Sequence, residues 1–125
     1  MLPLEFVVFG TPIAGRGPAR QFWIQKVKEA ALARLPGAAS PSPGPIIFRL
    51  GYYYVAAPAA DLDNIVKPVQ DALKGLAYLD DIQVVDLVAR MRPKANPGEV
   101  SMSAVLLGGL KGHSDFLHVL VEAFP

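Results

Sequence analysis

Residues 46–91, IIFRLGYYYVAAPAADLDNIVKPVQDALKGLAYLDDIQVVDLVARM, contain the pattern that decides the fold. The stretch opens and closes with segments rich in β-branched and aromatic residues, 46–55 and 82–91, which predict two strands. Between them, residues 64–76 carry apolar side chains at the spacing of one helical face, which predicts a helix. The segments before and after residues 46–91 predict further elements that extend this strand–helix–strand unit.

The segments on either side extend the unit in both directions. Upstream, residues 4–9 predict a strand and residues 21–35 predict a second helix. Downstream, residues 100–107 predict a strand that forms a hairpin with 82–91, and residues 114–122 predict a short terminal helix. The expected order is β-α-β-α-β-β plus a short C-terminal helix. It corresponds to a two-layer α+β fold, in which helices cover one face of a mixed sheet.

Length and composition favour one globular domain over residues 1–125. A chain of 125 residues with 52% hydrophobic and 18% charged residues can build a core, which excludes intrinsic disorder. Residues 36–45, rich in Pro, Gly and Ser, predict a flexible loop, because they can neither continue a helix nor pair in a sheet. The sequence has no cysteine, which excludes disulfides, thiolate metal sites and cysteine nucleophiles.

The chain shows no pattern of a membrane or secreted protein. No apolar run approaches the ~18 residues that a membrane span requires. The first residues lack the basic start and long apolar stretch of a signal peptide. We therefore expect a cytoplasmic protein without a membrane partner.

The net charge of +1 conceals an acidic block in the middle of the chain. Residues 1–60 carry six basic and two acidic side chains, residues 61–89 two basic and six acidic, and residues 90–125 four basic and three acidic. Two carboxylates ~5 Å apart repel each other by about 3 kcal/mol at an effective dielectric constant of about 20. Such a block predicts a bound cation unless the fold separates the side chains.

The aspartates of this block lie where predicted elements meet. Asp61 and Asp63 precede the helix, and an extended segment would point both to one side, about 6.7 Å apart. Asp80 and Asp81 open the next strand, and only one of these neighbours can easily point to the same place. Oxygen ligands of this kind suit Mg²⁺ or Mn²⁺. Lys67, one helical turn beyond Asp63, is suited to stabilising the charge of a pentacovalent phosphate.

A purely structural interpretation accounts for each of these residues separately. Asp63 can cap the helix, and Lys67 can form surface ion pairs with Asp63 and Asp71. The Asp80-Asp81 pair can form a turn. This interpretation gives no reason for the Asp-x-Asp spacing or for the acidic pair. The metal-site hypothesis accounts for both.

Residues 10–17, GTPIAGRG, have the glycine spacing of a phosphate-binding loop between a strand and a helix. Arg16 stands where that loop needs a lysine, and Gly17 stands where it needs a magnesium-binding hydroxyl. We therefore expect no nucleotide cofactor. Arg16 and Arg20 are instead candidate contacts to phosphates.

The ordered set of residues in 61–84 resembles the RusA family of Holliday-junction resolvases. The family pattern is an Asp-x-Asp-Asn, a lysine three residues on, and a helix that leads to Asp-Asp with a glutamine nearby. It is met by Asp61, Asp63, Asn64, Lys67, Asp71, Asp80, Asp81 and Gln83. The strand that ends in Gly10-x-Pro12, followed by basic residues, is also similar to family members. The resemblance extends over residues 4–107, and its specific part is 61–84.

This resemblance implies a homodimeric, magnesium-dependent, structure-specific endodeoxyribonuclease, and the oxygen ligands described above also suit Mn²⁺ as a substitute ion. Such an enzyme resolves four-way or branched DNA by paired nicks on opposed strands, leaves 5′-phosphate ends, and acts in recombination and repair. By position, the family's catalytic and metal-binding carboxylates fall on Asp61, Asp63 and Asp81, and its catalytic lysine falls on Lys67. Asp80 matches the neighbouring acidic position and is a further candidate ligand.

Basic residues near this block are candidate contacts to the DNA backbone, where they would position the nucleic acid. They are Arg16, Arg20, Lys26, Lys67, Arg92 and Lys94.

Two other functions stay open at this level. A non-catalytic DNA-binding protein, such as a prophage remnant, needs no metal. Another metal-dependent phosphohydrolase is the second alternative, because haloacid-dehalogenase-like phosphatases also begin with Asp-x-Asp. Those enzymes require an apolar strand directly before the motif, and residues 56–60, AAPAA, do not supply one.

Overall fold

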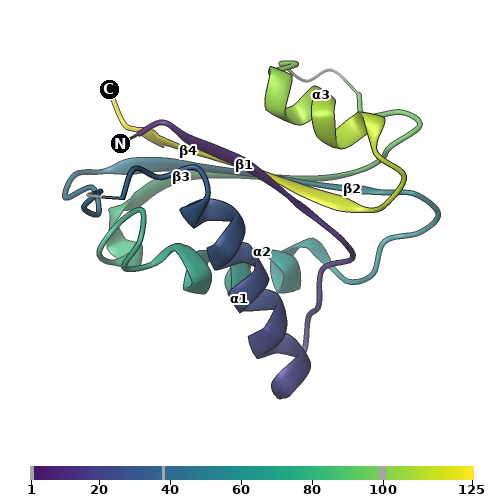
Figure 1. Ribbon diagram of the computed structural model, residues 1–125, viewed down its shortest axis with the longest axis horizontal. Coiled ribbons are helices and arrows are strands. Elements are labelled where there is room, and N and C mark those ends of the chain that lie inside the picture. Colours follow the sequence, from purple (N-terminus) through teal and green to yellow (C-terminus); the bar gives the residue numbers. More distant parts are fainter. Residues whose placement is uncertain (1, 38, 99–100) are drawn as a thin grey trace.

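The computed structural model describes residues 2–37, 39–98 and 101–125 and contains a mixed four-stranded sheet with helices on both faces (Figure 1). The strands are β1 (Leu4–Phe9), β2 (Ile46–Tyr54), β3 (Val84–Pro93) and β4 (Phe116–Ala123). The helices are α1 (Pro18–Leu32), α2 (Leu62–Leu73) and α3 (Ala104–Lys111), with the 3₁₀ turn η1 (Asp81–Gln83) before β3.

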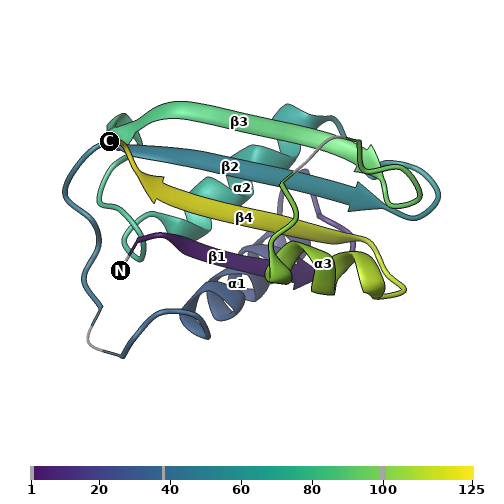
Figure 2. The same cartoon turned by 90° about the horizontal axis from the view of Figure 1, so that it is seen from above.

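The strands follow the order β1-β4-β2-β3 across the sheet (Figure 2). β4 runs antiparallel to both of its neighbours, β1 and β2, whereas β2 and β3 are parallel and are connected through α2. A parallel pair requires such a crossover, while antiparallel pairs do not. The predicted α+β class with a mixed sheet is confirmed.

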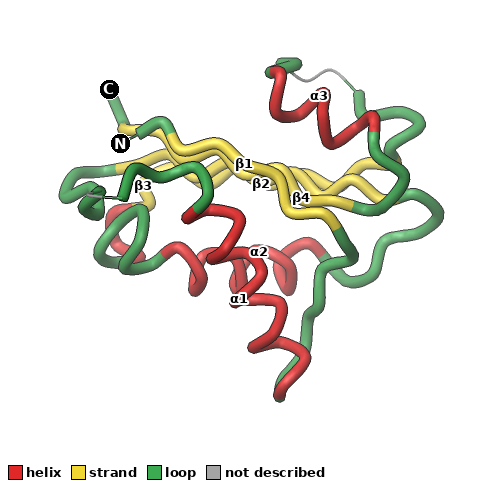
Figure 3. The backbone as a smooth tube through the Cα atoms, in the orientation of Figure 1, coloured by secondary structure: helices red, strands yellow, loops and turns green. Residues whose placement is uncertain are grey.

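The main core lies between the sheet and the pair α1 and α2, which cover the same face (Figure 3). Strand side chains alternate between faces, so every second residue of β1 and β4 points into this core. The residues concerned are Leu4, Phe6, Val8, Leu117, Val119 and Val121, and all are buried. Trp23 and Val27 of α1 pack against them from the other side.

A smaller apolar cluster lies on the opposite face, beneath α3. The rings of Tyr53 and Phe116 stack there with centroids 5.0 Å apart, and Leu106 of α3 packs against them. A Cβ atom on Gly109 would overlap the ring of Phe116. Glycine at this position therefore allows α3 to approach the sheet closely.

The last two elements differ from the sequence-based prediction. The strand predicted over 100–107 is wrong where the structure describes it: residues 104–107 belong to α3, and residue 100 lies outside the described residues. The terminal helix predicted over 114–122 is also wrong, because β4 runs there between β1 and β2. α3 also lies on the face opposite α1 and α2, so the helices do not cover only one face (Figure 1).

Local sequence explains both differences. Residues 116–121, FLHVLV, are almost continuously apolar, as is typical of a strand that is covered on both faces. Ser103 provides the N-cap of α3, since its hydroxyl accepts a hydrogen bond of 3.1 Å from the Leu106 N–H. None of the helices within the described ranges has the length and hydropathy needed to cross a lipid bilayer.

Candidate functional site

The start of α2 holds the first two aspartates of the motif. The helix begins two residues earlier than predicted, with Asp61 as its N-cap, and the Asp61 backbone carbonyl accepts from the N–H groups of Asn64 and Ile65 at 3.1 and 3.2 Å. Asp63 lies in the first turn, and its Oδ1 accepts from the Asn64 N–H at 3.0 Å. Asp61 is itself extended, but Asp63 is helical, so the fully extended 61–63 segment considered above does not form. Both residues stand at the N-terminal end of α2.

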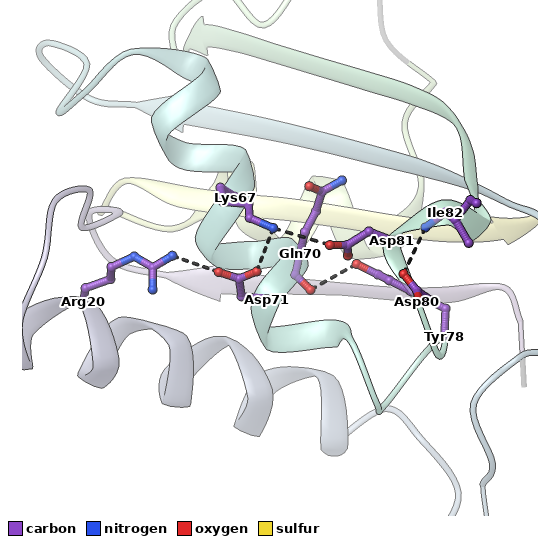
Figure 4. A network of polar contacts seen from close by, with 8 residues as sticks. All are labelled: Arg20, Lys67, Gln70, Asp71, Tyr78, Asp80, Asp81 and Ile82. Atoms are coloured by element: carbon purple, nitrogen blue, oxygen red, sulfur yellow. Dashed lines mark hydrogen bonds and ion pairs between the residues drawn. The ribbon is translucent and has the colours of Figure 1, made fainter.

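Lys67 connects α2 to the acidic turn η1. Asp63, Lys67 and Asp71 follow one another at four-residue intervals on one face of α2, as predicted. The Lys67 Nζ lies 3.1 Å from Asp71 Oδ1 and 3.4 Å from Asp81 Oδ2 (Figure 4). From α1, the Nη2 of Arg20 reaches Asp71 Oδ2 at 2.9 Å. We call these four side chains, Arg20, Asp71, Lys67 and Asp81, the charge network.

The charge network keeps its central members ionised. Burial disfavours the charge of Asp71, but hydrogen bonds from Arg20 and Lys67 outweigh this and hold its pKa below the ordinary 3.8. The hydrogen bond to Asp71 and the charge of that carboxylate raise the pKa of Lys67 above the ordinary 10.5. At neutral pH the network therefore presents an ammonium group to Asp81.

Asp81 has one carboxylate oxygen that no described residue contacts through a hydrogen bond. Its Oδ2 faces Lys67, whereas its Oδ1 is shielded from solvent and accepts no hydrogen bond from the described residues. An unpartnered, shielded carboxylate oxygen costs free energy and has the chemistry of a ligand for a hard cation. Asp80 is engaged differently, because its Oδ1 accepts from the Ile82 N–H at 3.4 Å and caps η1.

The structure does not gather three carboxylates into one coordination group. Among the described residues, no set of three His, Asp or Glu side chains is arranged so that it could hold a metal ion. Magnesium is commonly held by only one or two carboxylates together with water and substrate phosphates. The donor types and the free Asp81 oxygen therefore fit this ion. The ligand roles of Asp61, Asp63, Asp80 and Asp81 stay predictions.

Gln83 holds the turn that carries the acidic pair. Its Oε1 accepts from the N–H groups of Leu79 and Asp80 at 2.7 and 2.9 Å. Its Nε2 donates to the carbonyls of Ser42 and Gly44 at 2.7 and 2.8 Å, which ties η1 to the Pro-rich loop. Sequence reasoning assigned no role to this residue, although the spacing from Asp80 to Gln83 is that of a capping box.

The candidate DNA-contacting residues differ in whether their charged groups are exposed or interact with other groups of the protein. Arg16 is exposed in the loop after β1, and Arg92 is exposed on β3 with its Nη1 donating to the Met91 carbonyl at 3.1 Å. The Lys26 ammonium lies 5.9 Å from the centre of the Trp23 ring. Arg16 and Arg92 are thus the members whose exposure best suits them to contact DNA.

Other candidate contacts are engaged within the protein. Arg20 and Lys67 belong to the charge network. Lys94 donates to the carbonyls of Gly112 and Ser114 at 2.6 and 2.9 Å, and its ammonium lies 5.5 Å from the Phe116 ring. The structure therefore directs Lys94 toward the turn between α3 and β4.

Comparison with known families gives one match. No curated protein matches the chain. The family model described as endodeoxyribonuclease RusA matches residues 18–102, from the first residue of α1 to the segment before α3. This range is more than half of the chain and contains the charge network and both pairs of motif aspartates. The chain belongs to the RusA endodeoxyribonuclease family.

Proposed function

We propose that this protein is a magnesium-dependent endodeoxyribonuclease that resolves four-way DNA junctions by paired nicks on opposed strands, in recombination and repair. The family match supports the nuclease class. The observation that carries the proposal is the contact between Lys67 and Asp81, which are 14 residues apart in sequence. This contact joins the two halves of the motif at one place on the surface.

The motif aspartates would hold the metal ion. Asp61, Asp63 and Asp81 are the candidate ligands, with Asp80 next to Asp81 in sequence. Because the structure does not bring three carboxylates of the described residues together, water and substrate phosphates would complete the coordination. Mn²⁺ would accept the same oxygen donors. When bound, the ion supplies polarisation of the phosphodiester and activation of a water nucleophile. In-line displacement would then leave a 5′-phosphate and a 3′-hydroxyl.

Lys67 would act directly on the substrate. Its ammonium is kept charged by Asp71, and it lies beside the carboxylate of Asp81. A fixed positive charge at this place stabilises the additional negative charge that a phosphodiester develops in the transition state. Arg20 supports this role from α1, because it holds the other oxygen of Asp71.

Substrate symmetry supports a homodimer. A four-way junction has approximate twofold symmetry, so a C2 dimer would place one active site at each of two opposed strands. The exposed cations Arg16 and Arg92 would contact phosphates and set the register of the DNA without reading its sequence.

A cleavage assay on four-way, forked and linear duplexes, with Mg²⁺ or with EDTA, tests the proposal. We expect symmetric nicks in the four-way substrate with Mg²⁺ alone. Asp63→Asn should reduce cleavage about 100-fold or more and keep or strengthen junction binding, because it removes a negative charge that faces phosphate. Asp86→Asn is the matched control, since Asp86 is exposed on β3 outside the motif. Undiminished cleavage by Asp63→Asn contradicts the proposed site. Junction binding without cleavage by the unaltered protein supports the non-catalytic alternative.

A further inference from the structure

The connector between β2 and α2 delivers Asp61 to the candidate site, and it has little side-chain packing of its own. Residues 55–59, VAAPA, are all exposed. A segment of small exposed residues gains little stabilisation from burial, so its position depends on its hydrogen bonds.

Asp115, in the turn before β4, holds the connector at both ends. Its Oδ1 accepts from the Val55 N–H at 2.9 Å, at the start of the connector. Its Oδ2 accepts from the Tyr52 hydroxyl at 2.7 Å, and that hydroxyl in turn accepts from the Ala59 N–H at 3.3 Å. Ala59 lies two residues before Asp61. One carboxylate therefore fixes the beginning of the connector directly and its end through Tyr52.

The same turn also holds the first residue of the loop that carries Arg16. The backbone carbonyl of Asp115 accepts from the Gly10 N–H at 2.8 Å, where the chain leaves β1. Gly10 has φ of 125°, a conformation that residues with a Cβ rarely adopt. The turn before β4 thus anchors two segments that carry candidate site residues.

Tyr52 is well suited to link Asp115 to the end of the connector. Its ring is fully buried in the main core, so the hydroxyl is held at a fixed place. Burial and the neighbouring Asp115 carboxylate raise the pKa of Tyr52, so its hydroxyl keeps its proton and donates it to Asp115 at neutral pH.

We infer that Asp115 and Tyr52 are positioning residues that hold the connector and thereby fix the position of Asp61 at the start of α2. The inference rests on the proposed function, because Asp61 is there a metal ligand. Asp115 lies outside the matched range 18–102, and Tyr52 lies outside the motif. The pair acts through Asp61 and does not itself touch substrate.

The test compares Asp115→Asn and Tyr52→Phe with the unaltered protein. Asn keeps the size of Asp but offers one acceptor oxygen in place of two, and Phe keeps the buried ring but lacks the hydroxyl. Glu5→Gln is the matched control. Glu5 is another partly buried carboxylate, and it contacts Ser103 and His118 instead of the connector.

Three measurements separate positioning from a general effect on stability. They are the Mg²⁺ concentration for half-maximal cleavage, the junction affinity in EDTA, and amide hydrogen exchange in residues 55–60. We expect both variants to need about 10-fold more Mg²⁺, as is common when a group that orients a metal ligand is lost. Junction affinity in EDTA should be unchanged, and the Val55 and Ala59 amides should exchange faster. Glu5→Gln should change none of the three.

The outcomes that overturn the inference are equally specific. Faster exchange with an unchanged Mg²⁺ requirement shows that the pair only stabilises the fold. Unchanged exchange shows that the hydrogen bonds do not hold the connector. In the double variant the Ala59 amide should exchange no faster than in Tyr52→Phe, because Asp115 reaches Ala59 through the Tyr52 hydroxyl, and faster exchange there contradicts this path.

The inference can also be judged if the proposed function fails. If the unaltered protein cleaves no DNA, calorimetric titration with Mg²⁺ replaces the cleavage readout. Weaker Mg²⁺ binding in Asp115→Asn and Tyr52→Phe than in Glu5→Gln then supports the positioning role, and equal binding overturns it.

Discussion

Arg20 and Asp71 lie 51 residues apart in the chain, yet their side chains meet at 2.9 Å and join α1 to α2. The Asp71 carboxylate also binds the Lys67 ammonium at 3.1 Å, and this ammonium lies 3.4 Å from Asp81 Oδ2. A residue of the first helix is thereby connected to the acidic turn before β3.

Arg20 is predicted to act mainly by positioning. Arg20→Gln frees one oxygen of Asp71, so Lys67 is held less firmly, and the single-turnover cleavage rate should fall by up to about 10-fold. The pair is partly exposed, so the free energy of unfolding should fall by no more than about 1 kcal/mol. A direct phosphate contact would instead weaken junction binding and reduce its salt dependence. Measuring the rate and the affinity separately over a salt series distinguishes the two roles.

Lys67 is predicted to stabilise the transition state. Lys67→Gln should lower the single-turnover rate about 100-fold while junction affinity changes much less. Lys74→Gln is the control, because Lys74 is an exposed lysine at the other end of α2. Equal rates for the two variants would assign Lys67 to a structural ion pair only.

Gln83 is predicted to hold the loop 36–45 in place. Gln83→Leu removes hydrogen bonds to backbone groups of η1 and of the loop, so the free energy of unfolding should fall by about 2 kcal/mol. Urea unfolding measures this loss. Limited proteolysis should cut the variant faster within 36–45 than elsewhere, and uniform cleavage would contradict a local role.

Gly109 is predicted to tolerate no side chain. Gly109→Ala places a methyl group against the Phe116 ring, and the resulting overpacking should cost about 1–3 kcal/mol. Gly108→Ala is a matched control in the same helix, since a Cβ at Gly108 meets nothing within 4 Å. Alanine at that position should leave stability unchanged or raise it by up to about 1 kcal/mol. Thermal unfolding of both variants provides the comparison.

Glu5 is predicted to contribute stability that is lost in acid. Burial disfavours its charge, but hydrogen bonds from Ser103 and His118 outweigh this and hold the pKa of Glu5 below the ordinary 4.5. A lowered carboxyl pKa stabilises the folded state fully above the unfolded value and progressively less below it. Glu5→Gln should therefore cost about 1–2 kcal/mol near neutral pH, and the difference should shrink below about pH 4. Urea unfolding across this range tests the sign.

The central part of the fold could be predicted because its signals are local. Residues 46–91 alternate between apolar strands and an amphipathic helix, and β2, α2 and β3 follow that pattern. The apolar segment 4–9 likewise forms β1. Residues 104–111, AVLLGGLK, and 116–121, FLHVLV, are short apolar runs in which helical and strand periods cannot be separated. Tertiary contacts decide between them, since Gly109 fits against Phe116 and β4 pairs with a strand on each of its two edges.

The candidate site could be predicted as a set of residues but not as an arrangement. The motif spacing indicated Lys67 on the face of Asp71, because four residues span one helical turn. The pairing of Asp71 with Arg20 and the anchoring of the connector by Asp115 depend on contacts between distant segments. No local pattern contains such information.

The position of β4 constrains the order in which the protein can be assembled during translation. β1, the first of the described strands to be synthesised, pairs in this sheet only with β4, the last of the described strands. Until that final segment emerges, β1 has no partner within the sheet, and β2 lacks one of its two neighbours. A nascent or prematurely terminated chain would therefore expose unpaired backbone that invites aggregation. We expect the sheet to form late, because its strand pairings join distant parts of the chain.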